Sequence, residues 1–175
     1  MKGDTREVAR TLREAFDRSF AEPSRPRPPR TGVLAIRVGG DPYGVRLGDV
    51  DGLHRDKPVL RTPSGFSELL GLSGFRGAAL PVYDLAALLG YPRAATPRWL
   101  VVAKGTPRIA FAFEAFEAHL GVERSELLSD AGSSTRPHLD GALPSPDGTR
   151  ALIRIASLVE MIMSRARPTS PVKER

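Results

Sequence analysis

Side chains that catalyse reactions or bind metal ions are few and scattered in this chain of 175 residues. His54, His119 and His138 do not recur at metal-ligand spacing, and no cysteine is present to complete a thiolate site. Ser73 lies in Gly71-Leu72-Ser73-Gly74-Phe75, which lacks the second glycine of a Gly-x-Ser-x-Gly nucleophile elbow. We therefore expect no catalytic residue, no bound metal ion and no cofactor.

The glycines at 71, 74 and 77 also fail as a phosphate-binding loop. They are spaced Gly-x-x-Gly-x-x-Gly and precede an apolar run, whereas a phosphate-binding loop follows a strand and opens a helix. We attribute these glycines to a turn whose backbone angles or close approaches exclude a side chain. This turn presents Arg76, the one charged residue between Gly71 and Asp84.

The residues that follow Arg76 predict a strand and a short helix that hold the turn in place. The apolar run 78–83 is typical of a buried strand. Asp84 has the side chain of a helix N-cap, because its carboxylate can accept from free amides of the first helical turn. Gly90 suits the C′ position after Leu89. The segment 71–90 therefore reads as turn, strand and helix.

Composition favours one all-β domain with short helices. The chain is long enough for one domain of ordinary size, and its 16 prolines and 17 glycines favour short strands and turns. No apolar run reaches the length of a membrane span, and the N-terminus lacks a signal-peptide core. The lack of cysteine is compatible with a reducing compartment. We expect a soluble, cytoplasmic protein.

The net charge of +6 belongs to the terminal segments. Residues 1–30 hold 8 basic and 5 acidic side chains and residues 165–175 hold 4 and 1, whereas residues 31–164 hold 14 of each. Composition therefore does not support nucleic-acid binding by the central region. The basic tails can still contact anionic surfaces weakly.

Residues 1–20 predict an amphipathic helix. Asp4 and Glu7 have capping-box spacing, and an apolar stripe follows at helical spacing. The stripe carries Val8, Leu12, Phe16 and Phe20. The helix packs either on its own domain or in the groove of a partner, and we favour a partner because residues 21–31 form an extended linker rich in proline and arginine. The basic tail 165–175 is expected to be disordered.

Three hairpins are predicted between these terminal segments. Strands are expected at 33–38 and 43–47, at 99–103 and 109–113, and at 139–143 and 151–155, each pair joined by turn residues. Residues 50–54 extend the pattern, and 121–129 suggest an irregular helical turn. Ser157 and Glu160 have capping-box spacing, which predicts a final helix beginning there.

The motifs of the central segment resemble those of the CheW-like coupling proteins of bacterial chemotaxis. The matching elements, in order, are Tyr43-Gly44-Val45, Val50-Asp51-Gly52-Leu53, Gly71, Arg76-Gly77, Pro81-Val82, Asp84-Leu85 and Leu89-Gly90. The resemblance covers residues 32–164. It implies a CheW-like domain of two side-by-side SH3-like five-stranded β-barrels with a shared apolar seam. Gly77, Pro81, Asp84 and Gly90 are its structural motif residues.

The resemblance further implies a non-enzymatic adaptor that couples methyl-accepting chemoreceptors to a CheA-type histidine kinase. The receptor hairpin tip is expected between the barrels, and the receptor-side residues map to Val50, Gly52, Gly71 and Arg76. The sequence departs from the family pattern at Gly52, Gly74, Ala86 and Ala156. The alternative is a divergent adaptor that no longer couples the kinase and binds another partner through the N-terminal helix and basic linker.

Overall fold

The structure is a computed structural model that describes Arg13 and residues 30–93, 97–128, 138–146 and 148–166. The expected N-terminal helix with its stripe, most of the linker and most of the basic tail lie outside the described residues. The first described strand begins at Arg30, so the last two residues of the expected linker are part of a strand. The last helix continues to Ala166, so the first two residues of the expected tail are helical.

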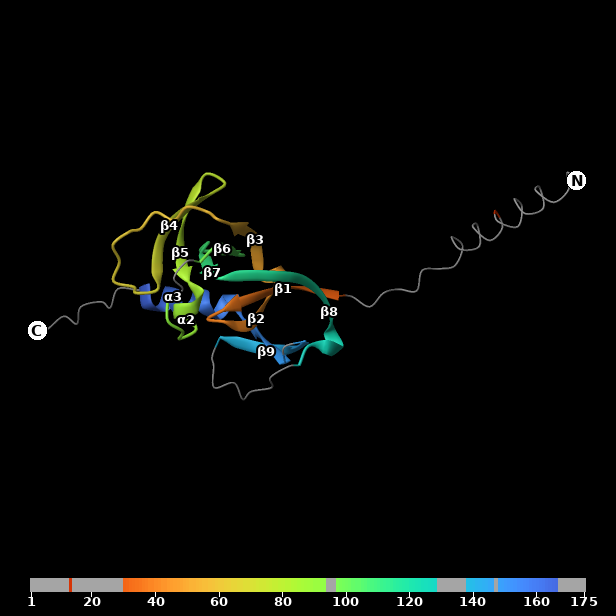
Figure 1. Cartoon of the computed structure of the whole chain (residues 1–175). Coiled ribbons are helices and arrows are strands. Elements are labelled where there is room, and N and C mark those ends of the chain that lie inside the picture. Colours follow the sequence, from red (N-terminus) through yellow and green to blue (C-terminus); the bar gives the residue numbers. More distant parts are fainter. Residues whose placement is uncertain (1–12, 14–29, 94–96, 129–137, 147, 167–175) are drawn as a thin grey trace, which may run out of the picture.

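The strands form two mostly antiparallel sheets of five strands each. The first sheet has the order β8-β1-β2-β10-β9, formed by β1 (Arg30–Val38), β2 (Asp41–Arg46), β8 (Ala115–Glu123), β9 (Leu139–Ser145) and β10 (Gly148–Ile153). The second has the order β3-β6-β7-β5-β4, formed by β3 (Val50–Arg55), β4 (Leu69–Phe75), β5 (Ala78–Asp84), β6 (Trp99–Ala103) and β7 (Ala110–Phe113). Figure 1 shows them as two lobes with the helix α3 (Ile155–Ala166) at their junction.

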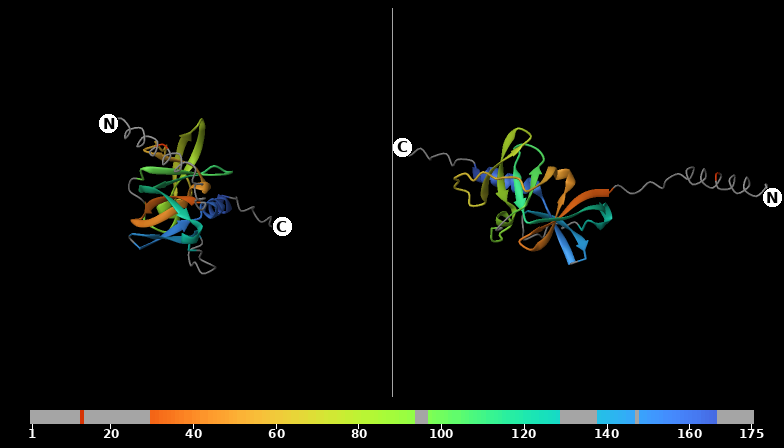
Figure 2. Two further views of the ribbon diagram at one scale, coloured as in Figure 1. Left: turned by 90° about the vertical axis from the view of Figure 1, so that its right-hand side faces the viewer. Right: turned by 45° about the horizontal axis from the view of Figure 1, so that its top comes forward.

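The two sheets follow one plan. In each, the strands pair antiparallel except for one parallel pair, β2 with β10 and β5 with β7. The hairpin β4–β5 leads into the helix α2 (Leu85–Leu88), as the hairpin β9–β10 leads into α3. The isolated bridge of Leu60 to Leu72 beside β4 matches that of Leu128 to Ala142 beside β9. The expected arrangement of two side-by-side five-stranded barrels is confirmed, and Figure 2 shows it from two further directions.

Apolar side chains gather in three clusters. One small cluster fills each sheet, around Val82 and Leu100 in one and around Val33 and Leu152 in the other. The largest cluster joins the sheets, because Phe111 and Phe113 of β7 pack with strand residues of the first sheet and with Leu158 of α3. This central cluster is the shared apolar seam expected between the barrels. It fixes the two lobes against one another through burial of large side chains.

The three predicted hairpins are present, but two strands are missing from the sequence-based prediction: β4 (Leu69–Phe75), where a glycine-rich turn was expected, and β8. β8 occupies Ala115–Glu123, where we expected an irregular helical turn from residue 121 onward. Its apolar residues at 116, 118, 120 and 122 alternate with polar or small residues, which is the period of a half-buried strand. That alternation is sufficient to predict the strand from the sequence. Only the short 3₁₀ turn Arg124–Glu126 within the expected segment is helical.

The predicted start of the final helix is also wrong. α3 begins at Ile155, two residues before the expected cap. The Ser157 hydroxyl lies inside the first turn and donates to the carbonyl oxygen of Arg154 at 3.0 Å, and it also bonds Nδ1 of His138 at 3.0 Å. Ser157 therefore bonds a carbonyl oxygen next to the helix and the ring of His138, which precedes β9, whereas a capping box would have bonded the amide of residue 160.

Candidate partner-binding site

The tip of the β4–β5 hairpin presents Arg76 to solvent. Phe75 and Ala78 are directly paired, so Arg76 and Gly77 alone form the connection, and the hairpin protrudes from its lobe in Figure 1. Both residues have positive φ, 46° and 80°, as a type I′ turn requires. Within the described residues, Arg76 makes no hydrogen bond or ion pair. A cation that is free to meet a partner is therefore held on a tight turn.

Only part of the expected glycine-rich turn is a turn. Gly71 and Gly74 lie within β4, and the reversal is limited to Arg76 and Gly77. Gly71 has φ 146° and is buried, and a Cβ there would overlap the carbonyl oxygen of Leu60 and lie 2.9 Å from the Cα of Arg61. Gly74 has neither a positive φ nor a neighbour within 4 Å of a Cβ. The close-approach explanation is correct for Gly71, and the left-handed backbone explanation for Gly77.

Two cationic or titratable side chains that sequence analysis did not select lie beside the hairpin. The His54 ring contacts the Phe75 ring edge-on at 5.0 Å between centroids. Lys57 places its Nζ 5.5 Å from the centre of the same ring and donates to the Gly74 carbonyl oxygen at 3.3 Å. Burial, followed by the charges of Lys57 and Arg76, lowers the pKa of His54. No local motif joins residues 54, 57 and 76, so only the pairing of strands could reveal them as neighbours.

The four expected receptor-side residues divide into two pairs. Gly52 lies under His54, because a Cβ at Gly52 would be 3.0 Å from Nε2 of that ring, and so it belongs to the same surface as Arg76. Val50 is only 9% exposed and packs in the central cluster. Gly71 is buried beside Leu60. A direct contact with a partner therefore remains a prediction that the geometry favours for Arg76 and for the surface over Gly52.

The motif residues after the hairpin hold the strand end and the helix. Asp84 is 0% exposed, and its carboxylate accepts from the amides of Ala86 at 3.0 Å and Ala87 at 3.4 Å, as an N-cap does. Gly90 has φ 87° and follows the C-cap residue Leu89. Pro81 lies in β5 just before the residues that pair with β7, where its missing amide costs no ladder bond. These are structural roles.

Replacing Asp84 with alanine is expected to destabilise the domain by about 1–2 kcal/mol, because two amides of α2 lose their acceptor. Asp84→Asn keeps an acceptor oxygen of the same reach and is expected to retain most of the stability. The midpoint of urea unfolding, followed by circular dichroism, measures both changes. Equal loss in the two variants would show that the charge of Asp84, and its 3.9 Å approach to Nε of Arg93, matters more than the cap.

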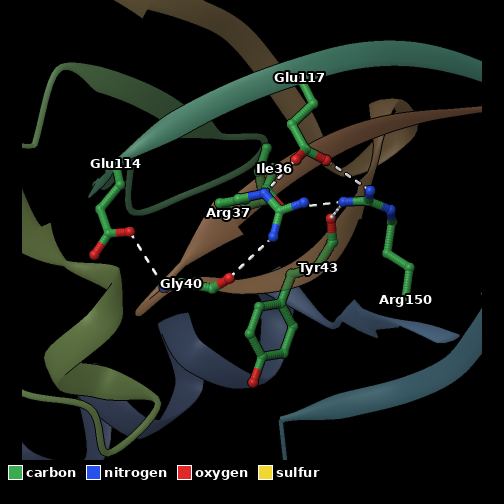
Figure 3. Close-up of polar contacts among 7 residues, drawn as sticks. All are labelled: Ile36, Arg37, Gly40, Tyr43, Glu114, Glu117 and Arg150. Carbon is green, nitrogen blue, oxygen red and sulfur yellow. Dashed lines mark hydrogen bonds and ion pairs between the residues drawn. The ribbon is translucent and has the colours of Figure 1, made fainter. Parts of the chain in front are cut away.

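A buried arginine ties its own strand to three other strands of the first sheet (Figure 3). Arg150 of β10 is 5% exposed and donates from one nitrogen to the carbonyl oxygens of Ile36 at 3.0 Å and Tyr43 at 2.9 Å. Its other terminal nitrogen donates to Glu117 of β8 at 2.6 Å. Arg37 donates to the second oxygen of Glu117. Burial alone would raise the pKa of Glu117, but the hydrogen bonds from Arg150 and Arg37 have the larger combined effect, so the pKa lies below its usual value.

The remaining histidines take part in local packing. His138 bonds Ser157, and His119 lies in β8 opposite Leu34. In the described part of the chain, no three His, Asp or Glu side chains gather into a set that could hold a metal ion. None of the described helices combines the length and the apolar character needed to cross a membrane.

Three further positions at which the sequence departs from the family pattern differ in exposure. Ala86 is buried in α2, whereas Gly74 and Ala156 are exposed.

Comparison with known proteins places this architecture in a family. The family model described as CheW-like domain matches residues 32–163. A curated relative, the probable chemotaxis protein CheW of Rhizobium etli, is 32% identical over 71 residues, which cover 40% of this chain and 46% of that protein. The aligned region thus spans less than half of the relative. In the crystal structure of the scaffolding protein TtCheW from Thermoanaerobacter tengcongensis, the match has a TM-score of 0.66 at 15% identity and covers 75% of this chain and 93% of that one, which shows the fold.

The family match spans both sheets, the hairpin with Arg76 and the helix at the seam. Asp84 and Gly90 are two of the motif residues that carry the resemblance, and they lie at the N-cap and just after the C-cap of α2. The chain belongs to the CheW-like domain family.

Proposed function

We propose that this chain is a non-enzymatic adaptor in a bacterial chemosensory array, where it couples methyl-accepting chemoreceptors to a CheA-type histidine kinase. The observation that carries the proposal is the match to the CheW-like family over the whole two-barrel domain. A scaffold role in chemotaxis agrees with the names of the relative and of the structural neighbour, a chemotaxis protein and a scaffolding protein. Its place is the cytoplasm, in clusters of receptors.

The receptor contact is assigned to the surface around Arg76. An exposed guanidinium on a tight turn can bond carboxylate or carbonyl oxygens in a forked geometry while its aliphatic stem covers apolar surface. Non-glycine residues with positive φ are energetically unfavourable, and only Arg76 and Asp56 adopt such angles among the described residues. The presence of an arginine in this unfavourable conformation supports a role in binding.

Arg76→Glu is expected to weaken receptor binding by about tenfold or more while the domain stays folded, because the charge offered to the partner is reversed. Arg76→Asn is the matched variant, since asparagine suits a type I′ turn and only the cation is lost. Calorimetric titration with a chemoreceptor cytoplasmic fragment measures affinity, and thermal unfolding measures stability. Unchanged affinity in both variants would remove Arg76 from the receptor site.

The kinase contact needs a separate test, which also decides between the proposal and its alternative. The full chain and a chain that begins at Arg30 are each mixed with a CheA-type kinase and with the receptor fragment, and bound protein is quantified after sedimentation. Binding of both partners by both chains supports the coupling role. Loss of kinase binding, with another partner held only when residues 1–29 are present, would favour the divergent adaptor.

A further inference from the structure

The acidic side chains of β3 and of the turn after it are paired with arginines of the same lobe. Asp56 accepts two hydrogen bonds from Arg98, at 3.0 and 3.1 Å, and lies 3.2 Å from Nε of Arg55. Asp51 lies 3.8 Å from Nε of Arg108. Asp51 and Asp56 are therefore not available to pair with the cations of the surface that contains Arg76.

Three side chains contribute to this surface. Lys57 and Arg76 are cations without an ion pair among the described residues, and His54 is a titratable ring whose nitrogens make no hydrogen bond there. Phe75 supports two of them, since the His54 ring contacts its ring edge-on and the Lys57 ammonium lies over that ring, and Arg76 follows Phe75 directly in the hairpin turn. Phe75 is 2% exposed, so it is a rigid support beneath the surface. His54 and Lys57 are thus held in place before any partner arrives, and the backbone of Arg76 is fixed by the two-residue turn.

We propose that His54, Lys57 and Arg76, arranged around Phe75, form one cationic site that binds a carboxylate-rich segment of a protein partner. The inference rests on the proposed adaptor function and names the chemistry by which its receptor side recognises a partner. A protein segment fits better than a nucleic acid, because the buried Phe75 ring offers no exposed face for base stacking and residues 31–164 carry balanced charge. Gly52 lies against His54, where a Cβ would come within 3.0 Å of Nε2, so a larger side chain at position 52 would crowd the ring.

The site predicts a direction of pH dependence. In the free protein, burial, Lys57 and Arg76 lower the pKa of His54, so the ring is neutral at neutral pH. Among the described residues, Phe75 of β4 contacts the His54 ring and Leu100 of β6 is the strand partner of His54, and neither side chain titrates. A bound carboxylate favours the protonated ring and raises its pKa, so binding takes up a proton. Affinity is therefore expected to increase as the pH falls from about 8 to about 6, by up to about tenfold.

The test uses the full chain labelled with ¹⁵N and a short synthetic peptide of glutamate, alanine and leucine. Its controls are the same peptide with glutamine in place of glutamate and a single-stranded DNA oligonucleotide of equal charge. We expect the glutamate peptide to shift the amide signals of Lys57 and of residues 74–78 and the ring signals of His54, and the glutamine peptide to leave them unchanged. Lys57→Gln and Arg76→Asn are each expected to lower the affinity for the glutamate peptide by about fivefold or more.

Two further variants separate the site from general charge effects. His54→Gln is expected to abolish the increase in affinity at low pH while most affinity at pH 8 remains. Arg30→Glu, at an exposed position on the other sheet whose ion pair with Glu123 is long at 3.6 Å, is expected to leave peptide binding unchanged. Peptide shifts that avoid residues 54, 57 and 74–78, or tighter binding of DNA than of peptide at these residues, would overturn the proposal.

The peptide titration tests the cationic site and the receptor titration tests the coupling function, so either hypothesis can be rejected without the other. Peptide binding at His54, Lys57 and Arg76 without any receptor binding would keep the cationic site and reject the coupling function. Receptor binding that is insensitive to Lys57→Gln and to pH would keep the function and reject this site as its contact.

Discussion

Gly71→Ala is expected to destabilise the domain by about 3 kcal/mol or more, although it adds a single methyl group. The methyl would overlap the carbonyl oxygen of Leu60, and the backbone of residue 71 has a φ of 146° that alanine rarely adopts. Leu60 cannot retreat freely, because it exchanges two backbone hydrogen bonds with Leu72, at 2.8 and 2.9 Å. The midpoint of urea unfolding measures the loss.

Gly74→Ala is the matched control for this prediction. It lies in the same strand, but its Cβ would meet open space and its φ is not positive, so its stability is expected to change by less than about 0.5 kcal/mol. Similar destabilisation in both variants would show that a general property of the strand, such as its twist, governs this segment. Gly71→Ala is also expected to weaken receptor binding only in proportion to the unfolded fraction, since Gly71 offers no surface of its own.

Arg150→Met is expected to cost about 3–5 kcal/mol, because it leaves Glu117 without its buried partner and removes the Arg150 donor from two buried carbonyl oxygens. Methionine has a similar volume, so the loss reports the polar contacts more than a cavity. Arg37→Gln removes only the exposed partner of Glu117 and is expected to cost less than about 1 kcal/mol. Denaturant unfolding of the two variants measures this difference.

Acid titration gives an independent check on the same cluster. The bonds from Arg150 and Arg37 hold the pKa of Glu117 below its usual value despite burial, so the ionised form stabilises the folded state. This stabilisation is fully present above the unfolded-state pKa of about 4.3 and is lost as the pH falls through the lower folded-state value. The free energy of unfolding of Arg150→Met is therefore expected to fall less steeply below pH 4.5 than that of the wild type. Parallel curves would place the acid sensitivity elsewhere.

Local patterns in the sequence were sufficient for much of the fold. The hairpins β1–β2 and β6–β7 and the cap at Asp84 involve residues close together in the chain, so alternation and turn residues predict them directly. β8 has an equally clear alternation at residues 116–122, so it is predictable from the sequence in the same way. The start of α3 was harder to predict, because Ser157 has the residue type of a cap but bonds His138 and Arg154 instead.

Residue types and short spacings were enough to predict the family, the all-β class, the structural roles of Asp84 and Gly90 and the lack of cysteine chemistry. Which distant residues meet depends on the way the strands pair and pack. His54 and Lys57 lie beside Phe75 and Arg76 because of how β3, β4 and the segment between them fold together, and Arg150 reaches Ile36 through the parallel pairing of β10 with β2. Such contacts depend on the order and register of strands across a sheet, and the alternation within one strand shows only which face is buried.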